Sequence, residues 1–114
     1  MQLNQLISNY QAGERDFSKI DLAGADLGGI DLSGSNLSLA NLQGANLNQA
    51  NLSNANLKGA ILQKANLSQA NLTNANLDMA DMGFANLTKA NLTGASMQMT
   101  ILFRAKLTGA IIPE

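Results

Sequence analysis

The chain has 114 residues, a formal net charge of −1 and no cysteine or histidine. This composition excludes a disulfide framework, a thiolate nucleophile, a soft metal site and acyl transfer by a Ser-His or Cys-His pair. The length predicts one small domain, and a net charge so close to zero gives no long-range attraction for nucleic acid or an anionic membrane. Aromatic residues make up only 4% of the chain, so we expect a core of Leu, Ile, Met and Ala.

The N-terminal segment predicts a short helix. Leu3, Leu6, Ile7 and Tyr10 fall at i, i+3, i+4 and i+7, which places them on one apolar stripe of a helix over residues 2–12. Gly13 supplies a C-terminal stop. The segment lacks the basic start and continuous apolar run of a secretory signal. We therefore expect residues 1–13 to form a capping helix over the first part of the remaining domain, residues 14–114.

A five-residue repeat occupies nearly all of the remaining chain. From Arg15 to Pro113 the sequence reads as twenty pentads in one register, without insertion or deletion. The central residue is Leu in sixteen pentads, Ala stands two positions earlier in fifteen, and Asn or Asp directly precedes the centre in fifteen. Ser, Thr or Gln most often follows, which gives the consensus Ala-Asn-Leu-Ser/Thr-X seen at residues 50–54.

A period of five suits neither a helix nor a long strand. On an α-helix each Leu would be rotated by about 140° from the last, and on a continuous strand alternate Leu residues would face opposite sides. Asn, Gly, Ser and Asp also favour turns over both elements. The repeat therefore predicts a short extended piece followed by a bend in every pentad, with Ala and Leu pointing inward together.

This pattern resembles the pentapeptide-repeat family, whose motif is written A(D/N)LXX, over residues 15–112. The resemblance implies an all-β fold: a right-handed quadrilateral parallel β-helix with four pentads in each coil and about five coils. Residues twenty positions apart would then stack on each other. Members of the family are abundant in cyanobacteria and mostly lack an assigned biochemical role, so the resemblance implies a fold more than a function.

Apolar residues replace polar ones at outward positions near the C-terminal end of the repeat. They are Met79, Phe84, Met99, Ile101, Phe103 and Ile111. Only Pro113 and Glu114 follow the last central residue, Ile112, so the sequence predicts an uncovered apolar end. We expect these residues to form a docking surface, most simply for a second copy of the chain. In the alternative, the same side chains fold over the end and cap it.

The acidic residues and the core departures have structural interpretations. Asp16, Asp21, Asp26 and Asp31 recur every five residues, so four-sided stacking places them on four different sides, too far apart to share one metal ion. We expect their carboxylates to bond nearby backbone donors. Ser35 and Thr100 replace Ala in the core, and each hydroxyl is expected to bond a local carbonyl.

These observations predict a non-catalytic protein-interaction or structural scaffold module without cofactor or metal. We expect a protein partner of unknown identity or a homodimer through the C-terminal coil, no nucleic-acid or membrane partner, and a cytoplasmic protein, since no run of 18 apolar residues occurs. The alternative is a regulator or inhibitor of a DNA-handling enzyme such as DNA gyrase, which some family members inhibit by mimicking duplex DNA. Only eight acidic residues in the whole chain and scattered lysines argue against that alternative.

Overall fold

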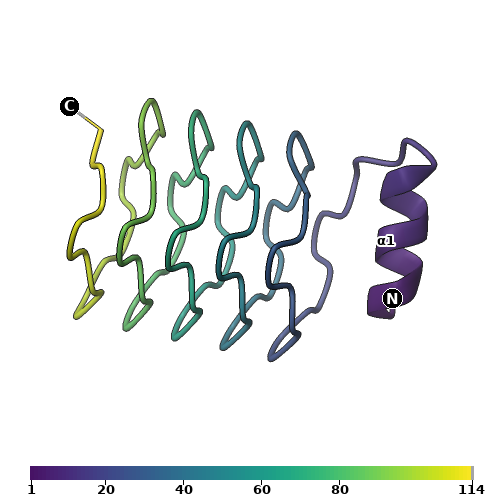
Figure 1. Ribbon diagram of the computed structural model, residues 1–114, viewed down its shortest axis with the longest axis horizontal. Coiled ribbons are helices and arrows are strands. Elements are labelled where there is room, and N and C mark those ends of the chain that lie inside the picture. The colour runs from purple at the N-terminus through teal and green to yellow at the C-terminus, as the bar shows by residue number, and fades with distance from the viewer. Residues whose placement is uncertain (114) are drawn as a thin grey trace.

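The computed structural model describes residues 1–113 and leaves Glu114, which the sequence prediction places in the terminal tail, outside the described residues. α1, the α-helix Leu3–Gln11, precedes a rod in which short parallel β-bridges take the place of long strands. Figure 1 shows the coils of this rod side by side along the long axis, with α1 at one end and residue 113 at the other. The molecule measures 35 × 24 × 22 Å along its principal axes.

Every bridge joins a residue to the residue twenty positions later, from Asp16 with Asn36 to Asn91 with Ile111. Four pentads therefore complete one coil, and each pentad forms one side of it. The central residue donates its N–H to the coil that follows: the amide of Leu62, for example, bonds the carbonyl oxygen of Asp81 at 2.7 Å. We number the sides by their central residues. Side 1 has its central residues at 17, 37, 57, 77 and 97. The central residues of sides 2, 3 and 4 likewise recur every twenty positions, starting at 22, 27 and 32 and ending at 102, 107 and 112.

The corners between sides are hydrogen-bonded turns. The N–H of the Ala that opens each new side donates to the carbonyl of the preceding central Leu, as Ala65 does to Leu62 at 3.1 Å. The residue just before that Ala has a positive φ at every corner from Lys19 to Gly109. This is the third position of a type II turn, which glycine and asparagine adopt most readily.

The Asn or Asp before each central residue stabilises the same bend from the other direction. In all fifteen pentads that carry one, its Oδ1 accepts the backbone N–H of the residue two positions on, at 3.0–3.2 Å. A following Ser or Thr adds its hydroxyl to the same oxygen, as Thr73 does to Asn71 at 2.8 Å. The consensus Asn therefore satisfies a backbone donor that no neighbouring coil reaches.

The core is a column of stacked central residues with small side chains between them. From Phe17 to Leu92 each central side chain is at most 5% exposed, and the alanines at 40–90 that precede them are at most 1% exposed. Large and small residues thus alternate inward, as close packing of a narrow tube requires. In the coil at residues 95–113 the central residues Met97, Leu102 and Leu107 are only partly buried, and Ile112 is exposed.

α1 lies over the first coil. Leu6 is fully buried, and Leu3 and Tyr10 pack partly against the core. Ile7, the remaining residue of the apolar stripe, is 37% exposed. The helix ends in a Schellman motif, because Gly13 N–H bonds the carbonyl of Tyr10 and Glu14 N–H bonds that of Asn9. Two further contacts fix it to the rod: the Tyr10 hydroxyl donates to the Ser33 carbonyl at 2.8 Å, and the Arg15 guanidinium stacks on the Tyr10 ring at 3.7 Å.

The two hydroxyls inside the core behave differently. Thr100 Oγ1 donates to a carbonyl, as the sequence predicts, but the acceptor at 2.7 Å is Leu77 on the preceding coil and not a local residue. Ser35 is 1% exposed and its Oγ has no hydrogen-bond partner, so the predicted bond to a local carbonyl is wrong for this residue. The carbonyl that accepts from Thr100 lies 23 positions earlier, on the preceding coil, whereas the residue 23 positions before Ser35 is Ala12 at the end of α1, so no coil precedes Ser35 at that place.

No helix among residues 1–113 is long and apolar enough to cross a membrane.

Candidate functional site

Seven of the nine exposed large apolar residues among the described residues of the rod lie on two adjacent sides, and the other two, Ile111 and Ile112, lie on side 4 of the last coil. We call the set of seven the side patch, and it consists of Leu39, Ile61, Met79, Phe84, Met99, Ile101 and Phe103. Leu39, Met79 and Met99 occupy the corner that ends side 1, twenty or forty positions apart, while Ile61, Ile101 and the two phenylalanines belong to side 2. Sides 3 and 4 carry Asn, Asp, Ser, Thr, Gln, Lys and Gly at the corresponding outward positions as far as residue 109. As far as residue 109, the rod therefore carries exposed large apolar side chains on two adjacent sides and only polar or small ones on the other two.

An aromatic pair lies at the centre of the side patch. The rings of Phe84 and Phe103 meet edge to face, with centroids 5.6 Å apart, although they come from successive coils. Phe84 remains 52% exposed, Phe103 62% and Met99 81%. An exposed apolar cluster of this kind on a small protein is typical of an interaction surface.

Four residues of the side patch stand at corners with positive φ. Leu39, Met79, Phe84 and Met99 have φ values of 58–60°, a conformation that is unfavourable for bulky side chains and that glycine adopts without cost. Their side chains also stay out of the core. Neither the turn nor the packing accounts for a large apolar residue at these corners, which favours a role outside the fold itself.

Two cations border the side patch. Lys64, Phe84 and Arg104 stand at the same corner of successive coils, so the ring of Phe84 lies between two basic residues. The Arg104 guanidinium carbon is 5.6 Å from the Phe103 ring centroid, within range of a cation–π contact. Side 2 has two acids, Asp21 in the first coil and Asp81 between Ile61 and Ile101. Asp81 accepts from the Gly83 amide and from the Gln63 side-chain amide. Its carboxylate is therefore already bonded inside the chain.

The structure brings five of the six residues predicted as an interface onto these two sides. The sixth, Ile111, is also exposed in the last coil but lies on side 4. Sequence reasoning also missed Lys64 and Arg104 as the basic border. The four-sided numbering contains that signal, because residues 64, 84 and 104 are twenty positions apart.

The acidic residues of the first coil do not converge. Asp16, Asp21, Asp26 and Asp31 each accept the N–H two residues on, the same bond that asparagine makes in later coils. Bonds from Ser18 and Ser33 hold the pKa of Asp16 and Asp31 below the ordinary value. No group of three or more acidic residues that could hold a metal ion occurs within residues 1–113.

Asp78 compensates for a missing asparagine. In the last coil Ser96 stands where the repeat has Asn, so the Gln98 amide has no carboxamide on its own coil to bond. Asp78, from the preceding coil, accepts both the Ser96 hydroxyl and the Gln98 N–H, the latter at 2.9 Å. These two bonds lower the pKa of Asp78, with the Ser96 hydroxyl as the larger cause. The acid is thus part of the backbone scaffold.

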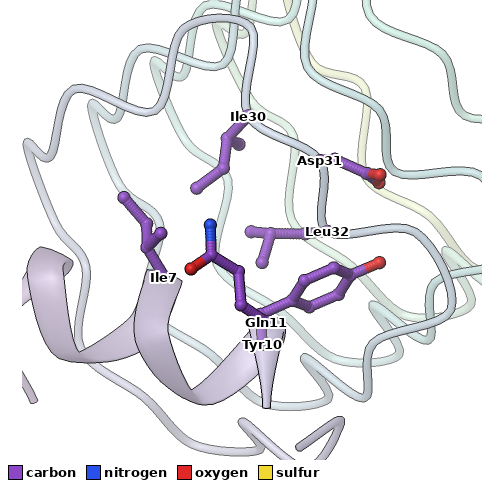
Figure 2. A pocket seen from close by; sticks show the side chains of 6 residues that line it. All are labelled: Ile7, Tyr10, Gln11, Ile30, Asp31 and Leu32. Carbon is purple, nitrogen blue, oxygen red and sulfur yellow. The ribbon is translucent and has the colours of Figure 1, made fainter. Parts of the chain in front are cut away.

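A pocket of about 300 Å³ lies where α1 passes over the first coil. Figure 2 shows Ile7, Tyr10 and Gln11 reaching it from the helix, and Ile30, Asp31 and Leu32 from the rod. Two of its polar groups are already paired: the Tyr10 hydroxyl bonds Ser33, and Asp31 accepts both the amide and the hydroxyl of Ser33. The pocket contains one acid and no base, so it offers no acid–base pair for catalysis.

Comparison with known proteins agrees with the four-sided rod. The family model described as pentapeptide repeats matches residues 16–54, 50–83 and 80–109, with 8 copies. The pentapeptide repeat protein Rfr23 from the cyanobacterium Cyanothece 51142 is 41% identical, with a TM-score of 0.79, over 81% of this chain and 63% of that chain. HetL from the cyanobacterium Nostoc sp. strain PCC 7120, a pentapeptide repeat protein involved in heterocyst differentiation regulation, is 37% identical, with a TM-score of 0.78, over 87% of this chain and 49% of that chain.

The chain thus spans less than two thirds of Rfr23 and about half of HetL. No curated protein sequence matches it. Proteins of this kind fold as right-handed quadrilateral β-helices, and the pairing of residues twenty positions apart is the pairing that such a fold requires. The matched repeats extend over most of the residues, and this chain belongs to the pentapeptide-repeat family.

Proposed function

We propose that this chain is a non-catalytic protein-interaction or scaffold module whose docking surface consists of the side patch and the adjoining coil at residues 95–113. The observation that carries the proposal is the segregation of large exposed apolar side chains onto sides 1 and 2, while sides 3 and 4 stay polar as far as residue 109. Random surface apolar residues would be scattered singly around the rod.

The chemistry of the side chains supports a non-catalytic role. Histidine and cysteine are missing from the sequence, and the carboxylates of Asp16, Asp31, Asp78 and Asp81 accept hydrogen bonds from their own backbone. A catalytic acid or base needs a cleft and a neighbour that shifts its pKa toward neutrality. The resolved shifts, at Asp16, Asp31 and Asp78, all go the other way.

The coil at residues 95–113 suits a second copy of the chain. In the described part of the molecule, the N–H groups of residues 97, 99, 102, 104, 107 and 109 make no hydrogen bond, while the equivalent groups of the preceding coil all bond this one. The carbonyls of residues 95, 100, 105 and 110 accept no hydrogen bond there either, so an occupant must supply both acceptors and donors around an apolar centre that meets Met97, Leu102 and Leu107. A coil of the same kind provides both, and α1 occupies the other end of each rod, so end-to-end contact would close as a two-fold dimer.

Sedimentation velocity over a range of protein concentrations tests the dimer. We expect a monomer–dimer equilibrium in the micromolar range that Ile112→Asp shifts toward monomer, because a charge would face the apolar centre of the contact. Gln69→Asp, an exposed change on side 3 outside this coil, is the control and should leave the equilibrium unchanged. A wild-type chain that stays strictly monomeric at high micromolar concentration contradicts the dimer.

A further inference from the structure

The side patch differs from the coil end in what it can bind, because its backbone is already paired. On side 2 the N–H of Lys64 bonds the carbonyl of Gly83 at 2.9 Å, and the N–H of Phe84 bonds that of Phe103 at 2.8 Å. A partner strand finds few free donors or acceptors there until the last coil. Recognition at the side patch must therefore go through side chains, which excludes strand addition as the binding mode.

The dimensions of the side patch match a helix. Leu39, Met79 and Met99 line one corner over three coil steps, roughly 14 Å at about 4.8 Å a step. The gap in this row is at Gly59, where the Leu39 side chain lies 2.8 Å from the position that a Cβ atom would take, so the apolar row is continuous. About three turns of an α-helix cover that length, with anchors at i, i+3 or i+4, and i+7.

The charge around the side patch indicates the sign of the partner. Lys64 and Arg104 flank Phe84 along the same corner, and no ion pair joins any two of the residues that the structure describes. Two acids lie beside the side patch, and both are already bonded. Asp81, between Ile61 and Ile101, accepts from Gly83 and Gln63. Asp78, next to Met79, accepts from Ser96 and Gln98. The two cations are therefore available to a carboxylate from outside, and a basic partner would meet like charge.

We propose that the side patch binds an amphipathic helix of a partner protein, with its apolar stripe along the row Leu39, Met79 and Met99 and against Phe84 and Phe103, and with Asp or Glu at the edge of the stripe facing Lys64 and Arg104. The inference depends on the proposed role as an interaction module and adds the chemistry of the partner. Methionines at the rim suit this mode, because their flexible side chains adapt to different apolar anchors.

Two synthetic amphipathic peptides of about five helical turns are the probes. Both carry the same Leu stripe; one has Glu beside the stripe and the other has Lys. Titration into the ¹⁵N-labelled chain should move amide signals of sides 1 and 2 with the Glu peptide and leave sides 3 and 4 unmoved. We expect the Lys peptide to bind at least tenfold more weakly.

Charge reversal makes the assignment specific. The double variant Lys64→Glu with Arg104→Glu should lose affinity for the Glu peptide and gain affinity for the Lys peptide, so that the preference inverts. The matched control, Lys89→Glu with Lys106→Glu, changes the net charge equally but on side 3 and should keep the wild-type preference. Phe84→Ser with Phe103→Ser should weaken both peptides, with an unchanged circular dichroism spectrum showing that the rod is intact.

Three outcomes would overturn the inference: no amide shifts with either peptide, equal binding of both peptides to the wild-type chain, or tighter binding of a single-stranded oligothymidine than of the Glu peptide at the same surface. Each is separate from the sedimentation result. If the chain dimerises through its last coil but does not bind the peptides, the proposed interaction role stands and the inference of an acidic helical partner fails. If the chain is monomeric but binds the Glu peptide, only the dimer proposal fails.

Discussion

Inward residues of this rod have little room for polar atoms, and Ser35 shows the cost. Its hydroxyl is buried and has no hydrogen-bond partner. Elsewhere along the small inward position Ala fills the same space without a polar atom. The fold tolerates the hydroxyl, but the free energy of unfolding should be lower because of it.

Ser35→Ala should therefore stabilise the chain by about 1 kcal/mol, since an unpaired buried hydroxyl costs on the order of 1–3 kcal/mol and the methyl group keeps the packing. Urea unfolding followed by circular dichroism measures the change. Thr100→Ala is the companion variant and should destabilise the chain, because its hydroxyl bonds the Leu77 carbonyl. An Ala variant at 35 that is less stable than wild type would show that the hydroxyl has a partner in solution.

Asp78 should make the last coil sensitive to acid. Its pKa is lowered from the ordinary 3.8 by the Ser96 hydroxyl and the Gln98 amide, so its stabilising effect is complete above about that pH and is lost as the pH falls through the lower, folded-state value. Asp78→Asn should be less stable than wild type at neutral pH, and the difference should be smaller at a pH below 3.8. Unfolding curves at both pH values check this. A difference that persists unchanged in acid would mean that the charge is irrelevant.

At the scale of elements, α1 and the corner turns set the limits of the rod. The apolar spacing of Leu3, Leu6 and Tyr10 and the glycine at 13 place the helix correctly to within one residue at each end, because both signals are local. Ile7 belongs to the same stripe but stays exposed. Its burial depends on how the helix sits over the first coil, and the pocket beside Ile30 leaves it uncovered.

Truncating Leu6 tests whether α1 is needed to cover the first coil. Leu6→Ala removes a fully buried side chain and should cost about 2–4 kcal/mol, with increased self-association because the core of the first coil becomes accessible. Thermal unfolding and light scattering measure the two effects. Gln5→Ala, an exposed change in the same helix, should alter neither. A Leu6→Ala chain as stable as wild type would show that the rod does not depend on the helix.

At the scale of the whole molecule, the repeat predicts most of the fold and less of the site. Leu62 and Ala60 point inward because their spacing of two fits one extended piece, and period five then requires a bend. The number of sides does not follow from that period; the pairing of Leu62 with the coil containing Asp81 determines it. Once four sides are known, Lys64, Phe84 and Arg104 align. The edge-to-face contact of Phe84 with Phe103 depends on side-chain rotamers, which the repeat does not specify.

The middle of the rod should tolerate no charge. Leu62→Asp places a carboxylate at a position with no exposed surface and no available donor, and the cost of several kcal/mol is comparable to the whole stability of a small domain. We expect loss of the folded spectrum at room temperature. Gln69→Asp, an exposed change at a corner of the same coil, should leave the spectrum intact. A folded Leu62→Asp protein would mean that the interior admits water.

The pairing of each residue with the one twenty positions later also governs how the chain can change length. Removing one residue would move outward side chains to inward positions, and inward ones to outward positions, in every later pentad. Excising a single pentad keeps every leucine inside but turns all later residues by a quarter revolution about the long axis. The direction in which Phe84 and Phe103 face relative to α1 is therefore set by a count of pentads. Deleting five, ten or fifteen residues between α1 and the side patch would turn the side patch to another direction relative to α1, without changing any of its side chains.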